Sequence, residues 1–117
     1  MAATAITKTE LKFNTVAVMP TPAAIDGTDG ATVEYDKADH KTLLIFTNAA
    51  AATKAVKIKA GNGIQGVADL DFTLAANGTH CVVIESMKFV NVSGADKGKV
   101  IITGADNNVK VSAVVLP

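Results

Sequence analysis

The chain has 117 residues, and its 11 acidic and 11 basic residues give a formal net charge of zero. Every basic residue is lysine, so the chain has no arginine for the planar, bidentate contacts with phosphate and guanine that nucleic-acid binding uses. With a pI near 6.7, this composition argues against a nucleic-acid partner. The length predicts a single domain over residues 1–117, and an apolar content of 49% is typical of a folded protein.

Neither a secretion signal nor a membrane segment is expected. The N-terminal residues MAATAITKTELKF contain no basic stretch followed by a long apolar one. No run of about eighteen apolar residues occurs anywhere in the sequence. We therefore expect synthesis in a cytoplasm and no membrane partner.

Strand signals recur along the chain as short segments rich in Val, Ile, Leu, Phe and Thr, separated by turn residues. The first, residues 4–13, alternates with an imperfect phase, and residues 1–12 are a candidate flexible or strand-donating arm. FNTVAVM, residues 13–19, alternates more clearly and predicts a strand. MPTPAAIDGTDG, residues 19–30, predicts a loop, because its prolines cannot donate ladder hydrogen bonds and its Asp-Gly pairs favour turns.

The middle of the chain carries the clearest strand patterns. ATVEYD, residues 31–36, predicts a short strand, and TLLIFTN, residues 42–48, is nearly all apolar and predicts a central, buried strand. Alternation is regular in KAVKIKA, residues 54–60, and in DLDFTL, residues 69–74. The alanine-rich residues 49–53 are too few to hold a helix and predict a connection.

Two hairpins are predicted in the second half. Asn77-Gly78 is the strongest short hairpin signal and predicts pairing of the strands on either side of it, 69–74 and 80–86. A last hairpin is predicted between 100–104 and 109–116, and 87–92 predicts one more strand. No helix of ten or more residues is indicated. The expected fold is all-β, an antiparallel β-sandwich or barrel of about eight strands, jelly-roll or immunoglobulin-like.

The glycines of AGNGIQG raise the question of a nucleotide site. Gly61, Gly63 and Gly66 fit G-x-G-x-x-G, and Glu85 follows at about the distance of a ribose-binding acid. That fingerprint needs a helix after the third glycine, whereas the sequence predicts a strand over 69–74. We therefore interpret the glycines as a connection between strands and expect no cofactor.

No catalytic or metal-binding set is predicted. A zinc site made of His40, Asp39, His80 and Cys81 is conceivable, but the spacing of these residues does not support it. Asp69 and Asp71 share one strand face and are more typical of a solvated surface than of a cation site or a glycosidase pair.

Nucleophilic catalysis has no sequence support either. His80 and Cys81 are neighbours on a predicted strand, so their side chains should point to opposite faces and cannot pair. Cys81 lies in the apolar run THCVVIE, which predicts a buried, inert thiol. The serines, Ser86, Ser93 and Ser112, have no motif around them. We expect a structural or binding protein and not an enzyme.

The C-terminal two-thirds carries a family resemblance. Within residues 42–117, VKIKAGNGIQGVADLDFTLAANGT is followed by VIESMKFVNVSGADKGKVIITGADNNVKVSAVVLP. The order of strands, glycine-rich loop, Asn-Gly turn and closing Leu-Pro resembles small β-rich virion proteins of tailed bacteriophages and prophages, of the capsid decoration or auxiliary head type. The resemblance implies a virion protein that binds a major capsid protein lattice, as a homo-oligomer such as a trimer, with no catalytic residues.

One rival function stays open beside capsid decoration. A tail- or fibre-associated β module would bind a host surface glycan, through Tyr35 or a carboxylate. Few aromatic residues, 4% of the chain, weigh against it, because sugar rings usually stack on aromatic faces.

Overall fold

The fold is built from β-strands alone in the part of the chain that the structure describes. A computed structural model describes residues 3–35, 41–62, 68–84, 89–104 and 108–117 and has no α-helix in these ranges. The strands are β1 (Thr4–Ala5), β2 (Lys8–Glu10), β3 (Ala23–Ala24), β4 (Ala31–Glu34), β5 (Thr42–Asn48), β6 (Lys54–Ile58), β7 (Leu70–Leu74), β8 (Thr79–Val83), β9 (Lys99–Gly104) and β10 (Val109–Val115). None of the described segments is a helix of the length and apolarity needed to cross a bilayer.

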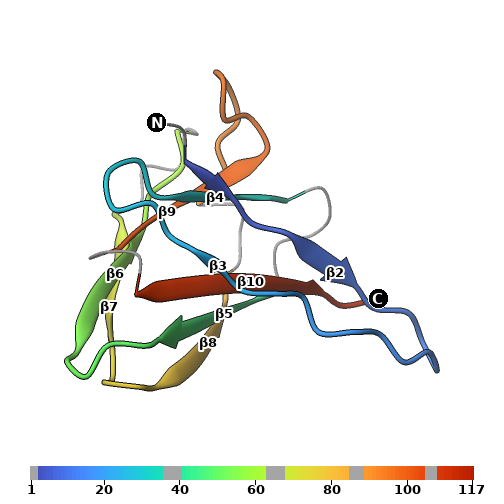
Figure 1. Ribbon diagram of the computed structural model, residues 1–117. Helices are drawn as coiled ribbons and strands as arrows, with labels where there is room; N and C mark the ends of the chain where they lie inside the picture. The colour runs from blue at the N-terminus through green and yellow to red at the C-terminus, as the bar shows by residue number, and fades with distance from the viewer. Residues whose placement is uncertain (1–2, 36–40, 63–67, 85–88, 105–107) are drawn as a thin grey trace.

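The strands form two sheets that face each other (Figure 1). Sheet A has the order β1-β4-β9-β6-β7, and sheet B has the order β2-β10-β5-β8, with β3 also paired to β10. The all-β, sandwich-like prediction is confirmed. The expectation of purely antiparallel pairing is wrong, because β1 runs parallel to β4 and β2 runs parallel to β10.

The core fills the space between the sheets and follows the period-two alternation of strands. In β5, Leu44 and Phe46 are fully buried while the residues between them are half-buried. Val56 and Ile58 of β6 are buried in the same way. The predictions of a central strand at 42–48 and of strands at 54–60 and 69–74 are therefore confirmed, each to within two residues at its ends.

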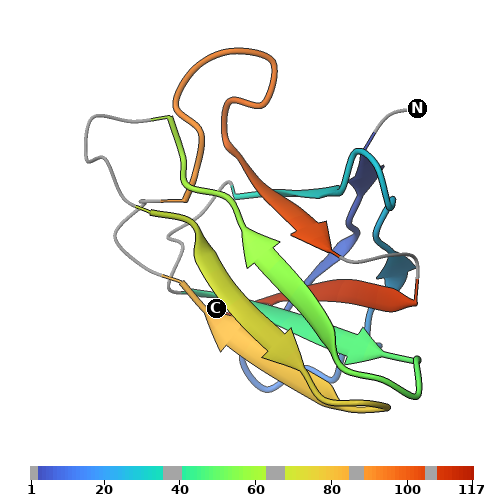
Figure 2. The same ribbon diagram turned by 90° about the vertical axis from the view of Figure 1, so that its left-hand side faces the viewer.

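The two long sides of the sandwich are built differently. On one side, residues 3–11 pass from the edge of sheet A to the edge of sheet B, and buried Ile6 lies between β1 and β2. Residues 4–10, part of the segment expected as a candidate arm, thus pair within their own chain. On the other side, β7 and β8 are the last strands of their sheets in the part of the chain that the structure describes, and residues 75–78 join them (Figure 2).

Both predicted hairpins are wrong, because each pair of strands is split between the sheets. β7 pairs with β6 in sheet A and β8 pairs with β5 in sheet B, and β9 and β10 are divided likewise. A tight Asn-Gly hairpin turn of type I′ needs positive φ at both residues, and only Asn77 has it, at 55°. Asn48, buried at the end of β5, instead donates from Nδ2 to the carbonyls of Ala52 and Ala75 and holds the connection open.

Two further strand predictions fail. Residues 13–19 form no strand, although their sequence alternates. Residues 89–92, the described part of the predicted strand 87–92, are also irregular. There Asn91 bonds through its backbone to residues 98 and 99, and this pairing closes a loop whose glycines, Gly94 and Gly98, have positive φ.

Candidate functional site

An exposed apolar loop is the most unusual feature of the surface. We call residues 13–19 the apolar loop; it projects beyond the sandwich between β2 and β3 (Figure 1). Four of its side chains lie largely in solvent: Phe13 is 77% exposed, Val16 98%, Val18 86% and Met19 62%. Exposing this many large apolar side chains together is unfavourable in water and marks a surface that binds something.

The chain at both ends of the apolar loop is anchored to the body. The Leu11 amide donates to the Val115 carbonyl at 2.8 Å, and Pro20 is buried. Asn14 has a positive φ of 57°, and the Thr15 hydroxyl donates to the Phe13 carbonyl, so the backbone turns there and cannot continue along β10. These local turns explain why an alternating sequence forms no strand within its own chain.

The free edge of β8 is the second apolar surface. Cys81 and Val83 point to the outer face of sheet B, opposite Ile45 and Leu43 of β5, and both are exposed. The prediction of a buried Cys81 thiol is therefore wrong: the apolar run around it belongs to an edge strand, where one face is open to solvent. His80 and Cys81 point to opposite faces, as predicted.

A slot lies beside this edge, between the two sheets. Its volume is about 270 Å³, and the residues that line it are Phe46, Leu70, Phe72, Thr73, His80, Cys81 and Val82. The rings of Phe46 and Phe72 bridge the sheets there, with centroids 5.1 Å apart and planes at 76°. Such an edge-to-face ring pair is favourable. Beside the pair, the apolar wall of the slot is open between β7 and β8.

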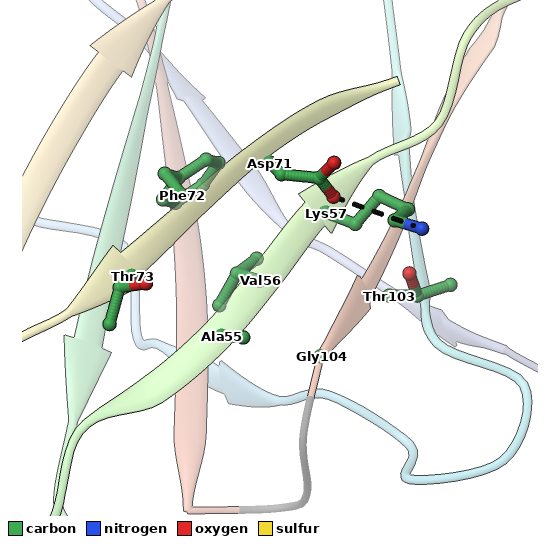
Figure 3. A pocket seen from close by; sticks show the side chains of 8 residues that line it. All are labelled: Ala55, Val56, Lys57, Asp71, Phe72, Thr73, Thr103 and Gly104. Carbon is green, nitrogen blue, oxygen red and sulfur yellow. Dashed lines mark ion pairs between the residues drawn. The ribbon is translucent and has the colours of Figure 1, made fainter. Parts of the chain in front are cut away.

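A shallow, mixed-polarity hollow covers the outer face of sheet A (Figure 3). It has a volume of about 450 Å³ over β6, β7 and the end of β9, and Thr73 and Thr103 contribute hydroxyl groups to its wall. The Lys57 ammonium and the Asp71 carboxylate lie 3.8 Å apart in it. Polar groups of this kind are available for hydrogen bonds to a polar ligand.

The paired acids form part of a surface charge network. Asp69 lies 3.9 Å from Lys57 and 3.8 Å from Lys59, and it accepts a 2.6 Å hydrogen bond from the Ala60 amide. This hydrogen bond lowers the pKa of Asp69 below its usual 3.8, and the two lysines act in the same direction against partial burial. The interpretation of Asp69 and Asp71 as a solvated face fits Asp71, whose side chain is 70% exposed, better than Asp69, whose side chain is 26% exposed.

The remaining candidates of the sequence are spread over the molecule. The strand predicted after the glycine motif is present as β7, while Gly63, Gly66, Glu85, Asp39, His40 and Ser86 lie outside the described residues. Ser112 is buried and Ser93 lies on an exposed loop, far apart in the chain. Among described residues, no group of three His, Cys, Asp or Glu is placed to hold a metal ion.

The sequence signal that would have located the apolar loop is that residues 16–19 carry no polar side chain on either face of an extended chain. Val16 and Val18 share one face of an extended chain, and Ala17 and Met19 share the other. A half-buried edge strand would carry polar residues on one of these faces.

Comparison with known proteins gives no assignment. No family model, no curated protein and no solved structure matches the chain.

Proposed function

We propose that this chain is a structural virion protein that decorates and stabilises a bacteriophage capsid. The observation that carries the proposal is the concentration of exposed apolar surface in one projecting loop and one sheet edge of a small β body. Surfaces of this kind form contacts between proteins. The resemblance of residues 42–117 to small phage virion proteins supports the capsid as the place of assembly.

The rest of the surface suits a protein that sits on a shell without adhering elsewhere. Net charge is zero, and Lys57 and Lys59 form ion pairs with Asp69 and Asp71. A near-neutral exterior gives little non-specific attraction to nucleic acid or membranes. A β-sandwich with a continuous core is also a rigid body, which a stabilising subunit requires.

The test is co-sedimentation of the purified chain with heads of the virus that encodes it. We expect saturable binding at a fixed number of copies per shell, and heads with bound protein should withstand heating or chelation better than bare heads. Heads of an unrelated phage serve as the control. Absence of binding to procapsids and to mature heads alike would overturn the proposal.

The hollow on sheet A favours a second candidate, a tail- or fibre-associated module that binds a host surface glycan. Lys57, Asp71 and two threonine hydroxyls offer the polar contacts of a sugar site. The expected stacking residue does not fit, because Tyr35 is only 5% exposed and belongs to the core. Saturable binding of a host polysaccharide that Asp71→Asn weakens, with Glu34→Gln as an exposed control, would favour this candidate over the capsid.

A further inference from the structure

We propose that the apolar loop of one copy adds as an extra strand to the free edge of β8 in a second copy. The inference goes beyond the proposed function and does not depend on it. Three features carry it: the pattern of the loop, the character of the β8 edge, and the placement of the two in the fold.

The apolar loop has the properties of a donated strand. Residues 15–19, TVAVM, are β-branched or apolar on both faces and contain no charge. No backbone hydrogen bond within the described chain involves residues 16–19, so these residues offer their amides and carbonyls to an outside partner. Strand addition to a sheet edge satisfies such groups through ladder hydrogen bonds.

The β8 edge is the one that matches this pattern. On its outer face lie Cys81 and Val83, and on its inner face Val82 borders the apolar slot. An added strand would therefore find apolar side chains on both sides of β8, with Thr79 and His80 as the polar residues of this edge. β8 also has no Lys, Pro or bulge of the kind that protects edge strands from pairing.

The other described edges suit the loop less well. β7 carries acidic Asp71, with a side chain 70% exposed, on its outer face. The edge formed by β2 carries Lys8 and Glu10, and β1 has two residues. Among the described edges, the uncharged loop thus has one of matching chemistry.

The fold keeps the two surfaces apart within one molecule. The apolar loop projects from the side where β2 and β3 lie, and β7 and β8 form the opposite side (Figures 1 and 2). The loop cannot reach its own β8, so the contact joins different copies head to tail. Repeated contacts of this type close into a ring or continue as a chain.

The native thiol provides the first test. We expect that single cysteines at positions 16 to 19 of the loop form intermolecular disulfides with Cys81 under mild oxidation. Neighbouring side chains of a strand alternate between its two faces, so only one face of the added strand can meet Cys81. We therefore expect one pair of variants to cross-link several-fold more than the other, the pairs being Val16→Cys with Val18→Cys and Ala17→Cys with Met19→Cys. Val92→Cys, in an exposed loop elsewhere, is the matched control.

Each variant is repeated in a Cys81→Ser background. The proposal requires that this change abolishes the alternating cross-links and the ladder of larger species that head-to-tail linkage produces. Cross-linking that is no greater than in Val92→Cys, that is equal at all four loop positions, or that persists without Cys81 would overturn it.

The second test measures assembly without cysteine chemistry. In sedimentation velocity, the native chain should form species larger than a monomer as its concentration rises, and Val16→Ser/Val18→Ser should stay monomeric. Both valines are solvent-exposed, so the variant should keep its circular dichroism spectrum. Val92→Ser should behave as the native chain does. A native chain that stays monomeric, or a folded loop variant that assembles equally, would refute the proposal, whatever the result with capsids.

Discussion

Gly30 allows the chain before β4 to lie close to the backbone of β9 in sheet A. Its φ is +78°, and a Cβ there would lie in contact with the Ile102 carbonyl oxygen of β9. Gly94 has a nearly equal φ of +83° with nothing around its Cβ position. The two glycines therefore separate the effect of backbone conformation from the effect of crowding.

We predict that Gly30→Ala lowers the free energy of unfolding much more than Gly94→Ala. Holding an alanine in the left-handed conformation costs about 1–2 kcal/mol, so both variants should lose this much unfolding free energy. Gly30→Ala must in addition displace a strand backbone. Urea unfolding at neutral pH measures both, and equal losses would contradict this account of Gly30.

Asp69 gives the molecule an acid-sensitive contact. The hydrogen bond from the Ala60 amide holds the pKa of Asp69 lower in the folded chain than its ordinary 3.8. The folded state therefore binds fewer protons than the unfolded state in this range, and the stabilisation is present above the unfolded pKa and lost as the pH falls through the folded one.

We predict that Asp69→Asn flattens the acid side of the stability profile. Between about pH 5 and pH 2, the native chain should lose more unfolding free energy than the variant does. Asp71→Asn is the control, since Asp71 shares Lys57 as an ion-pair partner but accepts no described backbone hydrogen bond. Thermal unfolding across this range tests it, and identical acid slopes for the native chain and Asp69→Asn would contradict the assignment.

At the scale of elements, β5 and β7 hold the open side of the sandwich together through one ring pair. Phe46 is fully buried in sheet B, and Phe72 reaches it from sheet A. We predict that Phe46→Leu and Phe72→Leu are non-additive in chemical unfolding, with a coupling of about 0.5–1.5 kcal/mol. Phe89, half-buried outside this pair, gives the control: Phe89→Leu combined with Phe72→Leu should be additive.

The positions of most strands could be predicted from the sequence, but the pairing of the strands could not. Alternation located β5, β6 and β7, because burial of one strand face is a local property. Pairing is non-local: β7 and β8 are joined by Asn77-Gly78 and still lie in different sheets. The bonds of Asn48 to Ala52 and Ala75 that favour this arrangement come from residues up to 27 positions apart.

The same distinction explains what was missed at the surface. Residues 13–19 alternate like a strand and have no strand partner in their own chain, and Cys81 lies in an apolar run but on an exposed face. In each case local composition predicts the apolar character correctly. Whether that surface is covered depends on which strand lies next to it, and for these two the partner is proposed to be another molecule.

At the scale of the whole molecule, the sandwich is closed on one side and open on the other. Residues 3–11, which include β1 and β2, pass from one sheet to the other on the closed side and bond to Gly30, Thr32 and Val115 through their backbone. The β7–β8 side has no such cover from the described residues. A copy bound there would complete the sandwich, so assembly and stability should be linked.

We therefore predict that the thermal midpoint of the native chain rises with protein concentration. A partner that binds only the folded state adds up to about 1.4 kcal/mol for each tenfold increase in concentration, which corresponds to several degrees for a domain of this size. Val16→Ser/Val18→Ser should show a constant midpoint equal to that of the native chain at high dilution, because its core is unchanged. Val92→Ser should follow the native curve. A midpoint independent of concentration in the native chain would mean that the open side is stable without a partner.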